Sequence, residues 1–153
     1  MDIVELIEDW RNKFSLPVRK TPQLVNLDEQ SLCLSLIDEE LNELRDAFKS
    51  NNLVEVADAC GDLLFVVMQA INVSGLDANK LISIIYESNM SKSCKTEEEA
   101  IATQEKYMKE KGVETFIDFK ELFFVKRKTD GKLLKSINFK EPQWREKYPE
   151  LFE

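Results

Sequence analysis

Two acidic segments in the first half of the chain carry the residue types best suited to chemistry. They are Glu39-Glu40-Leu41-Asn42-Glu43 and Glu55-Val56-Ala57-Asp58. The second segment lies near the start of residues 53–71, which would form a helix with apolar side chains on almost every side. Its only charges are Glu55, Asp58 and Asp62, which fall within about 60° of one another on the helical wheel. We therefore expect a buried helix whose acidic line faces a cavity or cleft.

The first acidic segment lies on a preceding helix. There Glu40 falls inside the apolar stripe, while Glu39 and Glu43 lie on its border. Because a short turn at residues 50–52 joins the two helices, we expect them to pack antiparallel with their acidic stripes facing each other. Converging carboxylates without lysine partners repel, and a divalent cation relieves the repulsion. All-oxygen ligation favours Mg²⁺ or Mn²⁺ over zinc. The alternative is a solvated acidic face, the usual role of paired glutamates.

The composition excludes several kinds of chemistry and partner. The 153 residues include no histidine, so imidazole bases and Ser-His or Cys-His pairs are ruled out. Four glycines are too few for a nucleotide-binding glycine loop, and a net charge of −8 disfavours nucleic acid. The longest apolar stretch is too short to span a membrane, and no secretory signal is visible. We expect a cytoplasmic protein that binds neither nucleic acid nor membrane.

The remaining pattern predicts an all-α helical bundle with a small C-terminal β-hairpin appendage. Five helices are expected, over residues 2–14, 28–49, 53–73, 77–92 and 97–111. Asp130-Gly131 between two β-prone runs, residues 122–128 and 132–137, predicts the hairpin. We interpret residues 1–153 as a single domain, with a helical core over about 1–112 and a hairpin tail over about 113–153.

Four motifs in order resemble the all-α nucleoside triphosphate pyrophosphohydrolases, in their MazG-like, phosphoribosyl-ATP-pyrophosphohydrolase-like branch. Glu39-Glu40-x-x-Glu43 followed by Glu55-x-x-Asp58 is similar to the E-E-x-x-E…E-x-x-D signature of that superfamily. Residues 57–67 are similar to its A-D-A-L-G-D-L-L-Y-V-V segment, residues 88–92 to S-N-M-S-K, and residues 130–136 to D-G-K-x-L-K-S. The resemblance covers roughly residues 5–140 and implies a MazG-like fold.

The resemblance also implies a reaction and a set of metal ligands. The reaction is Mg²⁺-dependent hydrolysis of the α–β phosphate bond of a nucleoside triphosphate, which gives a nucleoside monophosphate and pyrophosphate. Metal ligation carries over to Glu39 or Glu40 and to Glu43, Glu55 and Asp58. In MazG itself the corresponding acids would fall at positions 59 and 62, and position 59 here is alanine. Asp58 and Asp62 therefore both stay as candidate ligands.

Roles other than metal ligation are also expected. Glu39 or Glu40 is the candidate base that accepts a proton from water. Asn89 and Lys92 of the S-N-M-S-K motif are candidates for substrate binding, against the alternative that Lys92 is simply solvated. Trp10 and Phe14 are interpreted as core residues in preference to a base-stacking pair. The basic residues of the predicted hairpin are interpreted as protection of an edge strand against pairing with another chain. They are Lys126, Arg127, Lys128 and Lys132.

We expect a homodimer or homotetramer, because a small monomer can hardly cover every face of the third helix. Two alternatives to the triphosphate reaction are carried forward. One is phosphoribosyl-ATP hydrolysis, ranked second because the dedicated enzymes are shorter and need no appended hairpin. The other is a non-catalytic helical protein that binds a metal ion or a basic partner.

Overall fold

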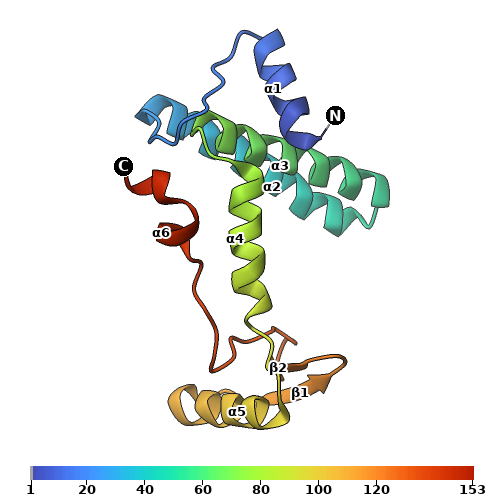
Figure 1. The fold of residues 1–153 in the computed structure, drawn as a ribbon. Coiled ribbons are helices and arrows are strands. Elements are labelled where there is room, and N and C mark those ends of the chain that lie inside the picture. The colour runs from blue at the N-terminus through green and yellow to red at the C-terminus, as the bar shows by residue number, and fades with distance from the viewer. Residues whose placement is uncertain (1) are drawn as a thin grey trace. The chain divides into compact units, whose positions relative to one another are not determined.

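The computed structural model describes residues 2–153 and is mostly helical, with one small sheet (Figure 1). The elements are α1 (Ile3–Lys13), α2 (Leu27–Ser50), α3 (Leu53–Val73), α4 (Ala78–Met90), α5 (Glu97–Lys111), β1 (Thr115–Phe119), β2 (Phe123–Arg127), α6 (Trp144–Lys147) and the 3₁₀ turn η1 (Pro149–Phe152). The predicted helical fold with a small hairpin near the C-terminus is confirmed, and the five predicted helices match α1–α5 within about two residues.

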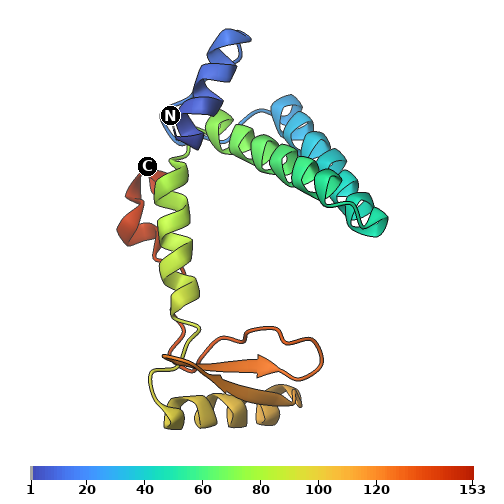
Figure 2. The ribbon, with the colours of Figure 1, turned by 90° about the vertical axis from the view of Figure 1, so that its right-hand side faces the viewer.

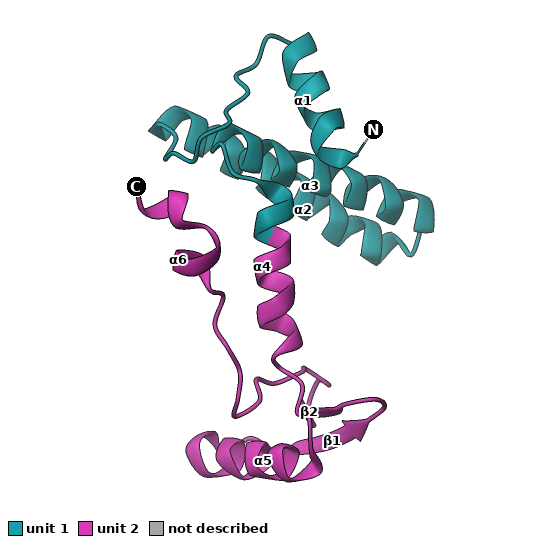
Figure 3. Cartoon of the chain, viewed as in Figure 1, with its two compact units in different colours: residues 1–81 teal, residues 82–153 magenta. Residues whose placement is uncertain are grey.

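The chain forms two compact units, residues 1–81 and residues 82–153 (Figure 3). Their boundary lies within α4, whereas the sequence placed the change of character near residue 112.

The centre of unit 1 is the pair α2 and α3, which run antiparallel side by side (Figures 1 and 2). The reversal takes two residues. Asn51 adopts the left-handed conformation that ends α2, and the Asn52 side chain accepts a hydrogen bond from the Val54 N–H and so begins α3. This tight turn fixes which residues of α2 face which residues of α3.

Helix α1 packs on α3 and is anchored there by a buried arginine. Arg11 donates from Nε to the Pro17 carbonyl at 2.8 Å and from Nη1 to Gln69 Oε1 at 3.3 Å. Trp10 meets the Phe65 ring edge-on, with centroids 5.2 Å apart. Burial lowers the pKa of Arg11, although the nearby Cys33 and Glu29 act in the opposite direction. The N-terminal helix is therefore fixed to α3 by one polar and one aromatic contact.

Unit 2 is built around a small core of Cys94, Ala100, Val125 and Leu134. Helix α5 begins at Thr96, whose hydroxyl accepts from the Glu99 N–H, and ends at Gly112 in the left-handed conformation. Both ends were predicted. Helix α5 packs on the antiparallel strands β1 and β2, which pair from Thr115–Arg127 to Phe119–Phe123.

The hairpin lies one strand earlier than predicted. Strand β2 pairs with residues 115–119, whereas residues 132–137 make a single isolated bridge, Lys126–Leu133. The Asp130-Gly131 turn itself is present. Arg127 donates two hydrogen bonds to Asp130, which lowers the pKa of that carboxyl to about 2. Residues 132–137 do not form a strand of the sheet, because Leu134 enters the core and the Ser136 hydroxyl donates to the Ser91 carbonyl, in the segment after α4.

The chain ends in two short turns, α6 and η1. The three aromatic residues of this segment, Trp144, Tyr148 and Phe152, differ in burial. Tyr148 is buried, Trp144 is half-buried and Phe152 is exposed. Lys147 of α6 forms an ion pair with Glu87 of α4.

Within residues 2–153, no single helix is both long and apolar enough to cross a membrane, and one bent pair, α3 with α4, passes the same test of length and composition.

Candidate active site

The antiparallel pair brings the acidic residues of α2 close to those of α3. The clearest sign is the pKa of Glu40, which is raised first by partial desolvation and then by four neighbouring charges, in the order Glu43, Asp62, Glu39 and Asp58. Of these four neighbours, Glu39 and Glu43 lie on α2 like Glu40, and Asp58 and Asp62 lie on α3. The acidic stripes therefore face one another across the helix pair.

These five carboxylates have no neutralising partner within residues 2–153. None of Glu39, Glu40, Glu43, Asp58 and Asp62 makes an ion pair or accepts a side-chain hydrogen bond there. The basic residues of α2 are engaged elsewhere, since Arg45 donates to Asn42 at 2.8 Å and Lys49 pairs with Asp46 at 2.6 Å. The negative charge of the cluster is left uncompensated by the chain.

Glu55 stands apart from the other candidate ligands because both of its carboxylate oxygens are occupied. Ser50 donates to one at 2.6 Å and the Asn52 side chain to the other at 3.1 Å. These bonds tie Glu55 to the turn that joins the helices. Sequence reasoning missed this second role, although a serine and an asparagine just before the first turn of a helix are a recognisable sign of it.

A shallow groove of about 380 Å³ runs between the helices beside that turn. Its walls include Glu43 of α2 together with Glu55 and Asp58 of α3. Asp62 lies one turn further along α3 and does not line the groove. Among residues 2–153, no three acidic or thiol side chains come close enough to hold a metal ion together. The structure thus brings the predicted residues face to face without closing them into a cage.

The first half of α3 is exposed in the single chain, in line with the expectation that a small monomer cannot cover every face of this helix. Leu53 is 81% exposed, Val54 76% and Leu64 50%, and Glu55, Asp58 and Asp62 are also exposed. The reason is that α3 has only α2 and α1 as helical neighbours within unit 1, and α1 reaches the other half of the helix. An apolar surface therefore remains uncovered in the single chain.

The two predicted substrate-binding residues lie in unit 2, at the end of α4. Asn89 is exposed and Lys92 is half-buried, and neither side chain has a partner within the described residues. The serines around them are structural. Ser136 donates to the Ser91 carbonyl at 3.0 Å, and Ser88 donates to the Lys140 carbonyl at 2.8 Å. Two of the matching motifs, residues 88–92 and 130–136, thus hold each other in place.

Trp10 behaves as the sequence interpretation expected of a core residue, since it contacts both Phe65 and Phe14. Phe14 itself is largely exposed, at 63%, because it follows the last residue of α1.

The family model described as phosphoribosyl-ATP pyrophosphohydrolase matches residues 7–89. The chain belongs to the phosphoribosyl-ATP pyrophosphohydrolase family. This confirms the resemblance found in the sequence, because the family is a member of the MazG-like all-α superfamily. The match takes in most of α1, all of α2 and α3, and α4 up to Asn89, so that every acidic candidate falls inside it and Lys92 falls outside.

A curated relative adds little about activity. The chain is 38% identical over 77 residues to the uncharacterized protein L479 of Acanthamoeba polyphaga mimivirus. That match covers 48% of this chain and 31% of the relative, so the chain spans less than a third of the relative's length. Family membership supports a pyrophosphohydrolase of the MazG-like kind and leaves the substrate to be proposed.

Proposed function

We propose that the chain is a Mg²⁺-dependent nucleoside triphosphate pyrophosphohydrolase. It adds water across the α–β phosphoanhydride bond and gives a nucleoside monophosphate and pyrophosphate. The observation that carries the proposal is the uncompensated carboxylate cluster between α2 and α3, where partial desolvation and then four neighbouring carboxylates raise the pKa of Glu40. A site of this sign can hold a triphosphate only together with cations, because the bare carboxylates would repel it.

The donor types present suit a hard divalent ion, although the side chains as they stand are not close enough to hold one and would have to move together around it. They offer carboxylate oxygens from two rigid helices, with no histidine in the sequence to favour zinc. Glu40, Glu43, Glu55, Asp58 and Asp62 would hold Mg²⁺, with Mn²⁺ as a substitute. When bound, the ion supplies positive charge for the phosphate oxygens and makes water more acidic. Glu55 would contribute least, because Ser50 and Asn52 already donate to its oxygens.

The proton from the attacking water goes to a carboxylate of the chain. Glu39 and Glu40 are the candidates, because both carboxylates lie on α2 at the cluster, and the one that is not fully used as a ligand can accept the proton. Asn89 and Lys92 are proposed to contact the substrate, the amide through a phosphate or sugar oxygen and the ammonium through a phosphate. Both side chains are available, since neither is bound to another residue described here.

A second copy of the chain is the proposed partner, in a homodimer or homotetramer. The exposed residues of α3 on the side next to the acidic line are apolar or small, and they fall within an arc of about 100°. They are Leu53, Val54, Ala57, Gly61 and Leu64. Because this stripe borders Asp58 and Asp62, a copy that covers it would also shield the acidic groove from water. Binding to nucleic acid or membrane is not proposed, and the cytoplasmic location stays a prediction.

Phosphoribosyl-ATP hydrolysis remains the second candidate, favoured by the name of the matching family. It uses the same bond cleavage, so the carboxylate cluster alone does not separate the two reactions. A non-catalytic metal-binding protein is the third.

One assay separates these candidates. The purified chain is offered canonical and modified (deoxy)nucleoside triphosphates and phosphoribosyl-ATP, each with and without Mg²⁺, and pyrophosphate release is measured. We expect Mg²⁺-dependent release from at least one triphosphate, together with loss of that release in Asp58→Asn. Release from phosphoribosyl-ATP only would select the second candidate. No release from any compound would remove the enzyme proposal.

A further inference from the structure

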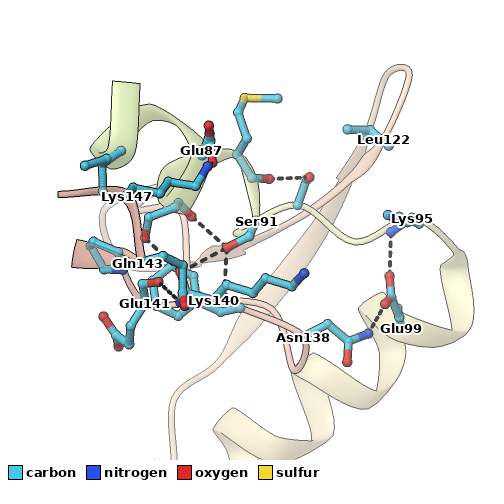
Figure 4. A pocket seen from close by; sticks show the side chains of 16 residues that line it. Glu87, Ser91, Lys95, Glu99, Leu122, Asn138, Lys140, Glu141, Gln143 and Lys147 are labelled. Atoms are coloured by element: carbon cyan, nitrogen blue, oxygen red, sulfur yellow. Dashed lines mark hydrogen bonds and ion pairs between the residues drawn. The ribbon is translucent and has the colours of Figure 1, made fainter. Parts of the chain in front are cut away.

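Unit 2 contains a pocket that the proposed reaction does not use. It has a volume of about 710 Å³ and is formed by the end of α4, the segment that follows it and the C-terminal segment 138–147 (Figure 4). All of its lining residues belong to unit 2, and most lie beyond residue 89, where the family match ends. The volume falls in the range of small-molecule sites, which is roughly 300–1,000 Å³.

One side of this pocket is apolar. The side chains that supply apolar surface come from α4, from the turn between the strands and from the C-terminal segment: Ile84, Met90, Leu122, Phe139 and Pro142. Phe139 adds an aromatic ring, over which the Lys135 ammonium lies 4.1 Å from the ring centroid, so that only the other side of the ring is open to a base. Such a wall suits the flat, weakly polar part of a ligand.

The carboxylates of the pocket are already engaged. Glu87 pairs with Lys147, and Glu141 pairs with Lys135 at 2.8 Å. Glu99 accepts from the Lys95 N–H and from the Asn138 side chain, and these bonds lower its pKa. The acidic groups therefore do not call for a cation.

Among the charged groups of the pocket, the ammonium groups of Lys95 and Lys140 form no ion pair or hydrogen bond within residues 2–153, and Lys140 is the one carried by the C-terminal segment beside Phe139. Figure 4 shows the Lys140 side chain running between Ser91 and Asn138, with no interaction drawn at its amino end. An unpaired lysine beside engaged carboxylates and an apolar wall favours an anion that also carries a flat ring.

The backbone that carries Lys140 is held firmly. Its N–H donates to Ser91 Oγ at 2.9 Å, and its carbonyl accepts from Ser88 Oγ at 2.8 Å. Ser88 is buried, and Ser136 fixes the other side of Ser91 through the bond to its carbonyl. The lysine is thus presented from a fixed position, which reduces the entropy that binding would cost.

We infer that this pocket of unit 2 is a second binding site, for a nucleoside monophosphate, whose phosphate meets Lys140 and whose base lies against the wall around Phe139. The choice of a monophosphate rests on the proposed function, of which it is a product. Binding here differs from binding at the acidic groove because it needs no divalent ion. A product held in this pocket would allow the enzyme to sense how much product has accumulated.

The experiment is a calorimetric titration of the full chain with AMP, CMP, GMP and UMP in the presence of EDTA. We expect at least one of them to bind, with affinity unchanged in Asp58→Asn, which disables the acidic groove. Lys140→Gln should weaken that affinity by about ten- to a hundredfold, the size of one charge-assisted hydrogen bond. Lys106→Gln, which removes an exposed lysine of α5 that does not line the pocket, should leave it unchanged.

A second variant separates the ring from the phosphate. Leu122→Trp should fill part of the pocket and block the nucleotide while leaving the weaker, Lys140-dependent binding of inorganic phosphate in place. Circular dichroism establishes that each variant is folded. Equal affinity in the wild type and Lys140→Gln would overturn the inference, as would loss of binding in Asp58→Asn or absence of binding for all four nucleotides. None of these results depends on pyrophosphate release, so this inference and the proposed function can fail separately.

Discussion

At the scale of single residues, Glu40 shows most directly what the acidic cluster does to the chain. It is the only member whose side chain is half-buried, and the charges of Glu43, Asp62, Glu39 and Asp58 all raise its pKa. Because the folded protein disfavours its charged form, ionised Glu40 destabilises the fold at neutral pH. That destabilisation disappears as the pH falls through the raised pKa.

We predict that Glu40→Gln raises the melting temperature at pH 7 and lowers kcat by about 10²- to 10⁴-fold, the usual contribution of a general base. The change in stability should shrink as the pH is lowered and Glu40 becomes protonated in the wild type. Differential scanning fluorimetry between pH 4 and pH 8, together with the pyrophosphate assay, measures both effects.

Asp38→Asn is the matched control for this variant. Asp38 is exposed on α2, two residues before Glu40 and so on the opposite side of the helix, and it does not contribute to the raised pKa. Asp38→Asn removes one negative charge from the same helix and should change neither the melting temperature nor kcat. An equal rise in melting temperature for both variants would mean that the net charge, and not the cluster, sets the stability.

At the scale of elements, the sequence predicted helices better than strands. Helix ends depend on neighbouring residues, such as Thr96 and Gly112 around α5, and these signals can be read locally. The hairpin depends on which of two segments pairs with β2. Asp130-Gly131 forms the predicted turn after β2, but Leu134 and Ser136 beyond it contact other parts of unit 2. A local pattern does not show that these contacts prevent residues 132–137 from pairing with β2.

Gly75 gives a prediction for the connection between α3 and α4. Its φ is +66°, and a Cβ added there would lie 2.0 Å from the Thr21 carbonyl oxygen. Gly75→Ala should therefore destabilise the fold by at least about 2 kcal/mol, since both the backbone conformation and the contact are unfavourable. Urea unfolding followed by circular dichroism measures the loss.

Gly61→Ala tests whether the effect is specific to that connection. Gly61 lies within α3, and an added Cβ would meet nothing within 4 Å. Alanine is the better helix former there and should stabilise the fold of the single chain by about 0.5–1 kcal/mol. Because Gly61 also lies in the stripe proposed as an interface between copies, unfolding is followed at a protein concentration at which the chain is dissociated. If both alanine variants were stabilising, the close approach of Thr21 to Gly75 would not exist in solution.

At the scale of the whole molecule, the two units differ in charge. Residues 1–81 contain 15 of the 29 acidic residues and 7 of the 21 basic ones, so they carry the entire net charge of −8, and residues 82–153 are neutral. This could be read from the sequence once the boundary was known. Which carboxylates of unit 1 face each other could be anticipated from the helical wheel, because the turn at Asn51 and Asn52 is short.

The sequence indicated that a single small chain could not cover every face of α3, but it did not say which half would stay exposed. A helix that is apolar almost all round predicts burial, but the pattern does not say which faces the same chain covers. In the single chain Leu53, Val54 and Leu64 remain exposed. Burying one such side chain stabilises an assembly by roughly 1.5–3 kcal/mol. Three of them on one stripe of the helix therefore favour association over exposure to water.

We therefore predict that the chain associates in solution through this stripe, with a mass that is a multiple of 17.8 kDa. Leu64→Lys should raise the dissociation constant by at least about tenfold, because it buries a charge in place of an apolar side chain. Ile101→Lys, an equally drastic change at an exposed position of α5, should leave it unchanged. Sedimentation equilibrium over a hundredfold range of protein concentration measures both constants. A wild-type chain that sediments at 17.8 kDa throughout that range would show that the stripe on α3 is not an interface between copies.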